Sequence, residues 1–103
     1  MPAVVKAEDL LHDRTRLSIV ALIAGDPSGC MTFTDVQKKL ELTAGNLSSH
    51  LRTLEQHNLV TVHKQFKGRR PQTTVLLTDI GKAALQQFIE EMELVIQRIK
   101  ESP

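Results

Sequence analysis

The feature that most constrains the fold of this chain is a change in hydrophobic periodicity near residue 59. Before this point apolar residues recur every three or four positions, as in helices, and after it they alternate, as in strands. We therefore expect a helix that runs to about His57 and a strand over residues 60–66. Asn58 lies between them and suits the left-handed backbone conformation that often follows a helix.

Two alternating segments predict a β-hairpin. One face of the first strand carries Val60, Val62, Lys64 and Phe66, and the other face carries Thr61, His63 and Gln65. The returning strand alternates through Thr73, Val75 and Leu77. Residues 67–71 are expected to form a polar turn, in which Gly68 permits a tight bend. Pro71 stiffens its exit, because proline cannot donate to a strand ladder.

A first helix is predicted from about Glu8 to Ala24. It ends at a dense turn signal, Asp26-Pro27-Ser28-Gly29, and a short extended segment over residues 30–33 follows. The apolar residues at helical spacing are Leu10, Leu11, Leu17, Val20, Ala21, Ile23 and Ala24.

Two further helices precede the hairpin. Thr34 opens the first of them with Gln37 as its capping-box partner, and Val36 and Leu40 face inward. Thr43 caps the next helix, after a connection of only residues 41–43. Two short helices joined so closely form a helix-turn-helix, and the hairpin directly after them is a wing.

A final helix of about twenty residues, roughly 30 Å long, is expected to begin at Thr78-Asp79. The predicted fold class is mainly α (α+β), a winged helix-turn-helix in a single domain spanning residues 1–103. Its expected parts are the helix-turn-helix at about 34–57, the wing at about 59–77 and a dimerisation helix at about 79–100.

The helix capped by Thr43 has two distinct faces. Its inward stripe consists of Ala44, Leu47, Leu51 and Leu54. Its outward face holds Gly45, Asn46, Ser49, Arg52, Thr53 and Gln56, with Ser48 and His50 on the flanks. This acid-free face suits the major groove of DNA, because Asn pairs with adenine, Arg with guanine, and Ser or Thr with several base edges. Gly45 removes bulk at the first turn, where free N–H groups favour a phosphate.

Basic residues gather in the same part of the chain. The net charge is +1, yet residues 43–73 hold five Lys/Arg and only one acid, Glu55. Lys67, Arg69 and Arg70 lie in the predicted wing tip, where long cations can reach phosphates or a narrow minor groove. The alternative is an ordinary solvated polar surface. Two unrelated signals on one surface, a hydrogen-bonding helix and a basic tip, favour nucleic-acid binding.

Several other functions find no support in the residues. Three Phe and no Trp or Tyr argue against stacking on single strands. Cys30, the only cysteine, allows no intrachain disulfide; a small buried apolar role is favoured over a redox sensor. His12, His50, His57 and His63 form no close pair, so we expect no metal site and no cofactor. The sequence contains no nucleophile–base pair that would indicate a catalytic site, so we do not expect an enzyme. The acidic N-terminal segment and the lack of an apolar run of about 18 residues predict a cytoplasmic protein.

The last helix carries a heptad stripe that predicts a homodimer. Its members are Leu85, Phe88, Met92, Val95 and Ile99, and Leu10 and Leu11 of the first helix are expected to assist. The alternative is that the stripe packs on the chain's own core. A two-fold dimer would place two recognition helices about one DNA turn apart, so the predicted site is pseudo-palindromic double-stranded DNA.

Residues 43–60 (TAGNLSSHLRTLEQHNLV) resemble the recognition helix and first wing strand of the MarR-like and ArsR-like winged-helix transcriptional regulators. Residues 66–78 (FKGRRPQTTVLLT), followed by Gly81-Lys82, resemble their wing and last-helix start. The similarity extends from about Arg14 to Leu85 and is closest to the small single-domain members.

The resemblance implies a dimeric transcriptional regulator, with repression as the expected sign, whose recognition helix enters the major groove. It implies DNA contacts by Asn46, Ser48, Ser49, Arg52, Thr53, Arg69 and Arg70; Thr43, Gly45 and Lys67 complete the candidate set. Residues 36–40 lack the paired cysteines of the metal-sensing branch, and no small-molecule effector is assigned. The rival hypotheses are a winged helix that only binds proteins and, less favoured, an RNA-binding domain, since the narrow A-form groove excludes such a helix.

Overall fold

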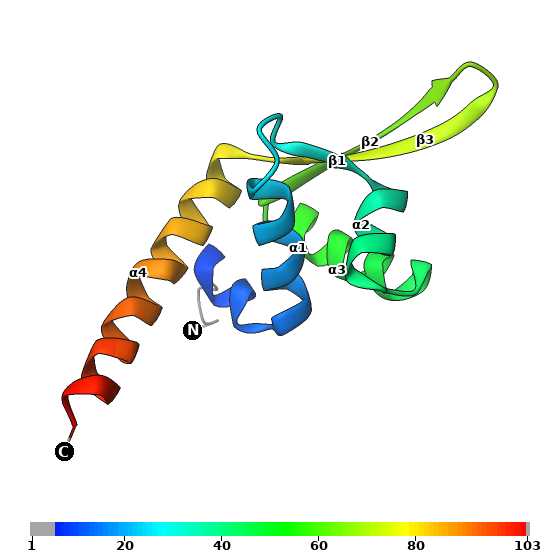
Figure 1. Ribbon diagram of the computed structural model, residues 1–103. Coiled ribbons are helices and arrows are strands. Elements are labelled where there is room, and N and C mark those ends of the chain that lie inside the picture. The colour runs from blue at the N-terminus through cyan, green and yellow to red at the C-terminus, as the bar shows by residue number, and fades with distance from the viewer. Residues whose placement is uncertain (1–5, 103) are drawn as a thin grey trace, which may run out of the picture.

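The computed structural model describes residues 6–102 and confirms the predicted winged helix fold (Figure 1). Four α-helices and a short 3₁₀ helix accompany a three-stranded antiparallel sheet within that range. The elements in chain order are η1 (Ala7–His12), α1 (Arg14–Ala24), β1 (Cys30–Thr32), α2 (Phe33–Leu40), α3 (Ala44–Gln56), β2 (Val60–Lys67), β3 (Arg70–Leu77) and α4 (Asp79–Glu101).

The molecule is elongated because two elements project from a compact centre. Its extents are 60 × 35 × 24 Å and its radius of gyration is 15.4 Å, whereas a compact domain of this length has a radius of about 13 Å. The far half of the β2–β3 hairpin extends from one end and α4 from the other (Figure 1). The wing and the last helix are therefore free to contact different partners.

The sheet has the strand order β1-β3-β2. The predicted extended segment after α1 is confirmed in part as β1, which pairs Met31 with Val75 of β3. The five-residue turn predicted for the hairpin is wrong: Lys67 pairs with Arg70, so only Gly68 and Arg69 form the turn. Gly68 has a φ of 66°, and a positive φ at the first central position lets two residues close a hairpin.

The single helix predicted from Glu8 to Ala24 is also wrong, because it is broken at Asp13. That residue has extended backbone (φ −101°, ψ 126°) and caps α1, its Oδ1 accepting a 3.0 Å hydrogen bond from the Arg16 N–H. Arg16 in turn donates from Nε to the Leu10 carbonyl at 2.9 Å. These contacts fold η1 back on α1, which buries Leu10 and Leu11 in the core.

The remaining helix ends follow local side chains. The cap predicted at Thr34 with Gln37 is wrong, since Thr32 caps α2 and accepts from the Asp35 N–H at 3.1 Å. The predicted caps at Thr43 and Thr78 are confirmed. Asn58 has the expected positive φ, 65°.

The core forms where the helices meet the sheet. Leu47, Leu51 and Leu54 of α3 are 0–3% exposed, whereas Ala44, predicted to face inward, is exposed. Cys30 is half-buried rather than buried. Among residues 6–102, none of the helices combines the length and apolar character that crossing a membrane requires.

The junction between β3 and α4 is tightly fitted. The Thr78 hydroxyl lies 2.6 Å from the Asn58 carbonyl oxygen and accepts from the Gly81 N–H at 2.9 Å. A Cβ at Gly81 would overlap the carbonyl oxygen of Leu59 and the side chain of Leu77. Glycine is therefore required at this position, and the start of α4 is held against the turn that follows α3.

The cap at Asp13 predicts a pH-dependent contribution to stability. The hydrogen bond from the Arg16 N–H holds the pKa of the Asp13 carboxyl below its ordinary value. Its contribution is thus present above the ordinary pKa of about 3.9 and is lost as pH falls through the lower pKa of the folded state. Asp13→Ala should reduce the free energy of unfolding by about 1 kcal/mol at pH 7.

Urea titrations at pH 7 and at pH 2–3 measure this effect. The difference between parent and Asp13→Ala should shrink at the lower pH, while Asp13→Asn, a good cap that does not titrate, should stay close to the parent at pH 7. A deficit of the alanine variant that is the same at both pH values would contradict an ionised cap.

Candidate nucleic-acid interface

The outward face of α3 presents most of the polar residues that the sequence predicted to contact DNA. Exposed candidates are Thr43, Gly45, Asn46, Ser48, Ser49 and Arg52. Thr53 is half-buried, and its hydroxyl donates to the Ser49 carbonyl at 3.4 Å, so it turns toward its own helix. The buried stripe of leucines on the opposite side fixes which residues look outward.

The first turn of α3 is partly capped. The Thr43 hydroxyl accepts from the Asn46 N–H at 3.1 Å, and the Leu47 N–H bonds to the Thr43 carbonyl at 3.0 Å. The N–H groups of Ala44 and Gly45 have no acceptor within the helix, as is usual at a helix start. A Cβ at Gly45 would meet nothing within 4 Å, so this side of the helix start is open, and free N–H groups at a helix start favour a phosphate.

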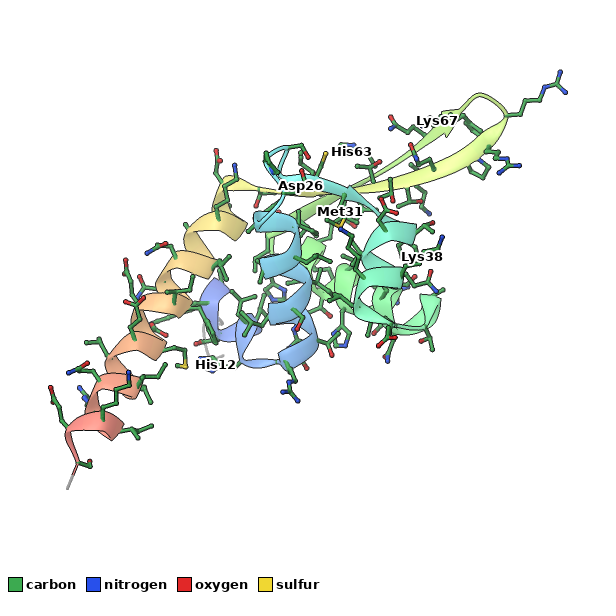
Figure 2. The ribbon with its side chains drawn as sticks, in the orientation of Figure 1. His12, Asp26, Met31, Lys38, His63 and Lys67 are labelled. Carbon is green, nitrogen blue, oxygen red and sulfur yellow. The ribbon has the colours of Figure 1, made fainter. Side chains whose placement is uncertain are left out.

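The wing tip concentrates the basic side chains. Lys67 and Arg70 pair across the hairpin, Arg69 lies in the turn, and all three are exposed. Figure 2 shows Lys67 near the end of the hairpin. The one ion pair among residues 6–102 joins Arg16 to Asp13 at 3.8 Å, so the wing cations are available to an anionic partner.

A groove lies in the corner between α3 and the base of the wing, and we call it the corner groove. Its volume is about 380 Å³, and it is lined by Phe33, Ser48, Leu51, Arg52, Glu55, Val62, Lys64 and Thr73. Arg52 of α3 and Lys64 of β2 therefore share one concave surface. The sequence predicted Arg52 but missed Lys64, although the alternation of β2 already put Lys64 on the same face as Val62.

Glu55 is the acid of the corner groove, and it has a structural partner. Its Oε2 accepts a 3.0 Å hydrogen bond from the N–H of Val62 in β2. Because β2 is an edge strand, this N–H has no ladder partner on that side. The carboxylate thus satisfies the strand edge and fixes the base of the wing relative to α3.

A second, more polar groove of about 610 Å³ lies between the start of α2 and the wing. Thr32, Thr34 and Asp35 line one side of it, and Lys67 and Arg70 line the other. No pattern in the sequence indicated that the start of α2 would lie beside the basic tip. The start of α2 therefore adds hydroxyl groups and one acid, Asp35, beside the two wing cations.

The histidines occupy separate places. His50 is half-buried, with Nδ1 3.5 Å from an Arg16 guanidinium nitrogen, and joins α3 to α1. His12 packs edge-on against Phe88 of α4, with ring centroids 5.1 Å apart. His57 contacts the Thr53 carbonyl and His63 the Thr61 hydroxyl. In the part of the chain that the structure describes, no three potential metal ligands come together.

The residues predicted for dimerisation fall into two groups. Leu10, Leu11 and Phe88 are 1–9% exposed and belong to the chain's own core, although Phe88 also lines an apolar groove between α1 and α4. Their contact with a second subunit stays a prediction. Leu85 and Met92 are half-buried, while Val95 and Ile99 are 44% and 68% exposed.

The alternative, packing on the chain's own core, therefore applies to the first half of α4 and not to the second. An apolar groove of about 360 Å³ runs between α1 and α4, lined by Leu17, Ala21, Leu85, Phe88, Ile89, Met92, Glu93 and Ile96.

The chain is similar in sequence and in fold to known proteins. Residues 15–96 match the winged helix DNA-binding domain family. The chain is 34% identical over 83 residues to the uncharacterized protein MJ0432 of Methanocaldococcus jannaschii. The aligned residues make up 81% of this chain and 88% of that protein. The transcriptional regulator homologue from Pyrococcus horikoshii OT3 has a similar structure, with a TM-score of 0.80 and 36% identity over 87% of each chain.

A more distant structure has the same fold. It is Sco3205, a MarR family transcriptional regulator from Streptomyces coelicolor in complex with DNA, with a TM-score of 0.71 and 18% identity over 95% of this chain and 65% of that chain. The match over residues 15–96 covers most of the sequence. The chain therefore belongs to the winged helix DNA-binding domain family.

Proposed function

We propose that this protein is a homodimeric transcriptional regulator that recognises a specific duplex DNA sequence. The observation that carries the proposal is the corner groove, which joins Arg52 of the recognition helix to Lys64 of a wing whose tip cations are unpaired. A duplex bound against both α3 and the wing would meet hydrogen-bonding groups from α3 and cations from the wing.

Each part of this surface has a separate role. Asn46, Ser49 and Arg52 read base edges in the major groove, and Ser48 lies at the edge of that contact. Thr43 and Gly45 position the start of α3 against a phosphate. Lys67, Arg69 and Arg70 bind the backbone and the adjacent minor groove. Occupying a promoter in this way leads most simply to repression, which is the proposed sign of regulation.

Two relatives support this function through what is known of them. The similar protein from Pyrococcus horikoshii is described as a transcriptional regulator homologue, and Sco3205 was solved bound to DNA. A protein-interaction module without DNA binding would have no use for unpaired cations at the tip of a projecting hairpin.

The second half of α4 is the proposed dimer seam. Val95, Ile96 and Ile99 are 44–68% exposed and are not packed against the core, although Ile96 lines the end of the groove between α1 and α4. An apolar stripe on a helix that leaves the domain is stabilised by a second such helix. The groove between α1 and α4 offers a matching apolar surface on the other subunit.

The charges favour an antiparallel pair of α4 helices. In the heptad set by Met92, Val95 and Ile99, Glu91 and Arg98 both occupy the position just before an inner residue. Antiparallel pairing brings these two positions together, so each Glu91 would meet Arg98 of the other subunit. A parallel pair would instead place Glu91 beside an apolar Ile96, which leaves the charge unpaired.

Selection of bound duplexes from a random pool, at stated salt, tests the function. We expect a pseudo-palindromic site whose halves lie about one DNA turn apart.

Changing Arg69 and Arg70 together to Ala should weaken DNA binding and lower the slope of log K against log salt concentration by about 1.8, since each lost phosphate contact removes about 0.9. Asn46→Ala should relax base preference at one position, at a cost of about 1–3 kcal/mol.

Lys82→Ala, which removes an exposed cation from α4, serves as the control and should bind like the parent. Parental affinity and base preference in both the wing and Asn46 variants would refute the site. A parent that selects no duplex, or that prefers structured RNA, would refute the function itself.

Sedimentation of the free protein tests the seam. Val95→Asp with Ile99→Asp should give a monomer, because a buried unpaired carboxylate opposes association, whereas Gln97→Asp on the opposite side of the helix should remain a dimer. Glu91→Arg should weaken the dimer and the added change Arg98→Glu should restore it. A dimer that persists in the double aspartate variant would contradict the seam, and failure of the charge exchange to restore association would contradict antiparallel pairing.

A further inference from the structure

Phe66 is a large apolar side chain that the fold leaves uncovered. It is 74% exposed, more than any other exposed large apolar residue of the described chain. The two other phenylalanines contribute to the core, Phe88 as a buried residue and Phe33 packed against it. Phe66 stands two residues before the glycine of the wing turn, so its exposure belongs to the wing and not to the dimer seam.

The register of the hairpin shows which way Phe66 faces. Alternate residues share a face of the strand, so Phe66 lies on the same side as Val62 and Lys64, which line the corner groove. Its cross-strand partner is Pro71. The pair Lys67 and Arg70 lies one step further, on the other face. The wing therefore carries an apolar face toward the side of α3 and a cationic pair behind it.

No part of the described chain covers this apolar pair. Burial along β2 falls from Val60, which is fully buried, through the half-buried Val62 to exposed residues from His63 onward. The wing tip and α4 lie at opposite ends of the molecule (Figure 1), so a second subunit joined through α4 does not reach Phe66 by that contact.

The surroundings of Phe66 define its partner. Lys64 lies on the same face as Phe66, Lys67 and Arg70 form the next pair on the other face, and Arg69 lies in the turn. These cations favour a polyanion as partner, while the phenyl ring favours an apolar surface on the same molecule. The minor groove of duplex DNA offers both, since phosphates line its rim and deoxyribose forms its walls. Phe and Pro are also among the side chains with which proteins enter the minor groove.

We propose that Phe66, backed by Pro71, packs against the sugars of the minor groove that adjoins the site of α3. This inference rests on the proposed DNA-binding function and adds a contact that does not depend on charge. The basic residues of the wing then supply salt-dependent affinity, and Phe66 supplies a salt-independent part by removing apolar surface from water.

Duplex binding measured across a range of salt concentrations separates the two parts. Phe66→Ala should weaken binding about tenfold, as expected for losing a partly buried phenyl contact, with the salt slope of the parent. Phe66→Leu should recover part of the loss. Leu76→Ala removes a 37% exposed apolar side chain from the opposite face of the sheet and should bind like the parent.

Circular dichroism and sedimentation of Phe66→Ala should match those of the parent, because the side chain contributes little to the core. Parental affinity in Phe66→Ala would overturn the inference, and so would a salt slope that falls together with affinity, which would mean that the ring only positions the cations. A changed oligomeric state would assign Phe66 to a protein contact instead. If the parent protein bound no duplex, the proposed function would fail first and independently of Phe66.

Discussion

Burial of three leucines on α3 is the constraint on which the interface depends. Leu47, Leu51 and Leu54 together leave almost no surface exposed, and removing a buried leucine side chain costs about 2–5 kcal/mol. A helix held this strongly cannot turn about its axis without losing that burial. The direction of Asn46, Ser49 and Arg52 is therefore set by apolar packing on the opposite side, and not by the polar residues themselves.

The wing receives its position from the same helix. Glu55 follows Leu54 by one residue, and its carboxylate binds the N–H of Val62 on the open edge of β2. Beyond Thr74, the last residue of β3 that pairs with β1, the hairpin is held mainly by pairing between β2 and β3. The two surfaces proposed to meet DNA are thus joined at the base and separate at the tip, with the corner groove between them.

Sequence reasoning succeeded where the signal was local. Thr43 and Thr78 each cap a helix through an N–H three residues further on, Asn58 takes the left-handed conformation directly after α3, and the change of period at residue 59 marks a change of element. Prediction from the sequence failed where two neighbouring residues could each have begun or ended a helix. Thr32 and Thr34 are both acceptable caps, and pairing of β1 with β3 decides between them by holding Thr32 extended. Asp13 interrupts an apolar pattern that would otherwise continue as one helix.

The residues of the interface could be predicted only in part for a similar reason. A helical projection places Arg52 outward and Leu51 inward correctly, but it cannot show that Lys64 lies across a groove from Arg52. That relation depends on the angle between α3 and β2, which long-range packing sets. The same holds for Leu10 and Leu11, whose burial depends on the packing of η1 against both α1 and α4.

The close fit around Thr78 and Gly81 makes α4 a rigid lever. A helix of 23 residues is about 34 Å long, so a tilt of about 5° at its start would displace its far end by about 3 Å, close to the rise of one base pair. In the proposed dimer, freedom at this joint would let the distance between the two recognition helices drift by a whole step of the duplex. The close packing at Gly81, which leaves no room for a methyl group, would in that way fix the distance between the two DNA half-sites that the dimer can bind.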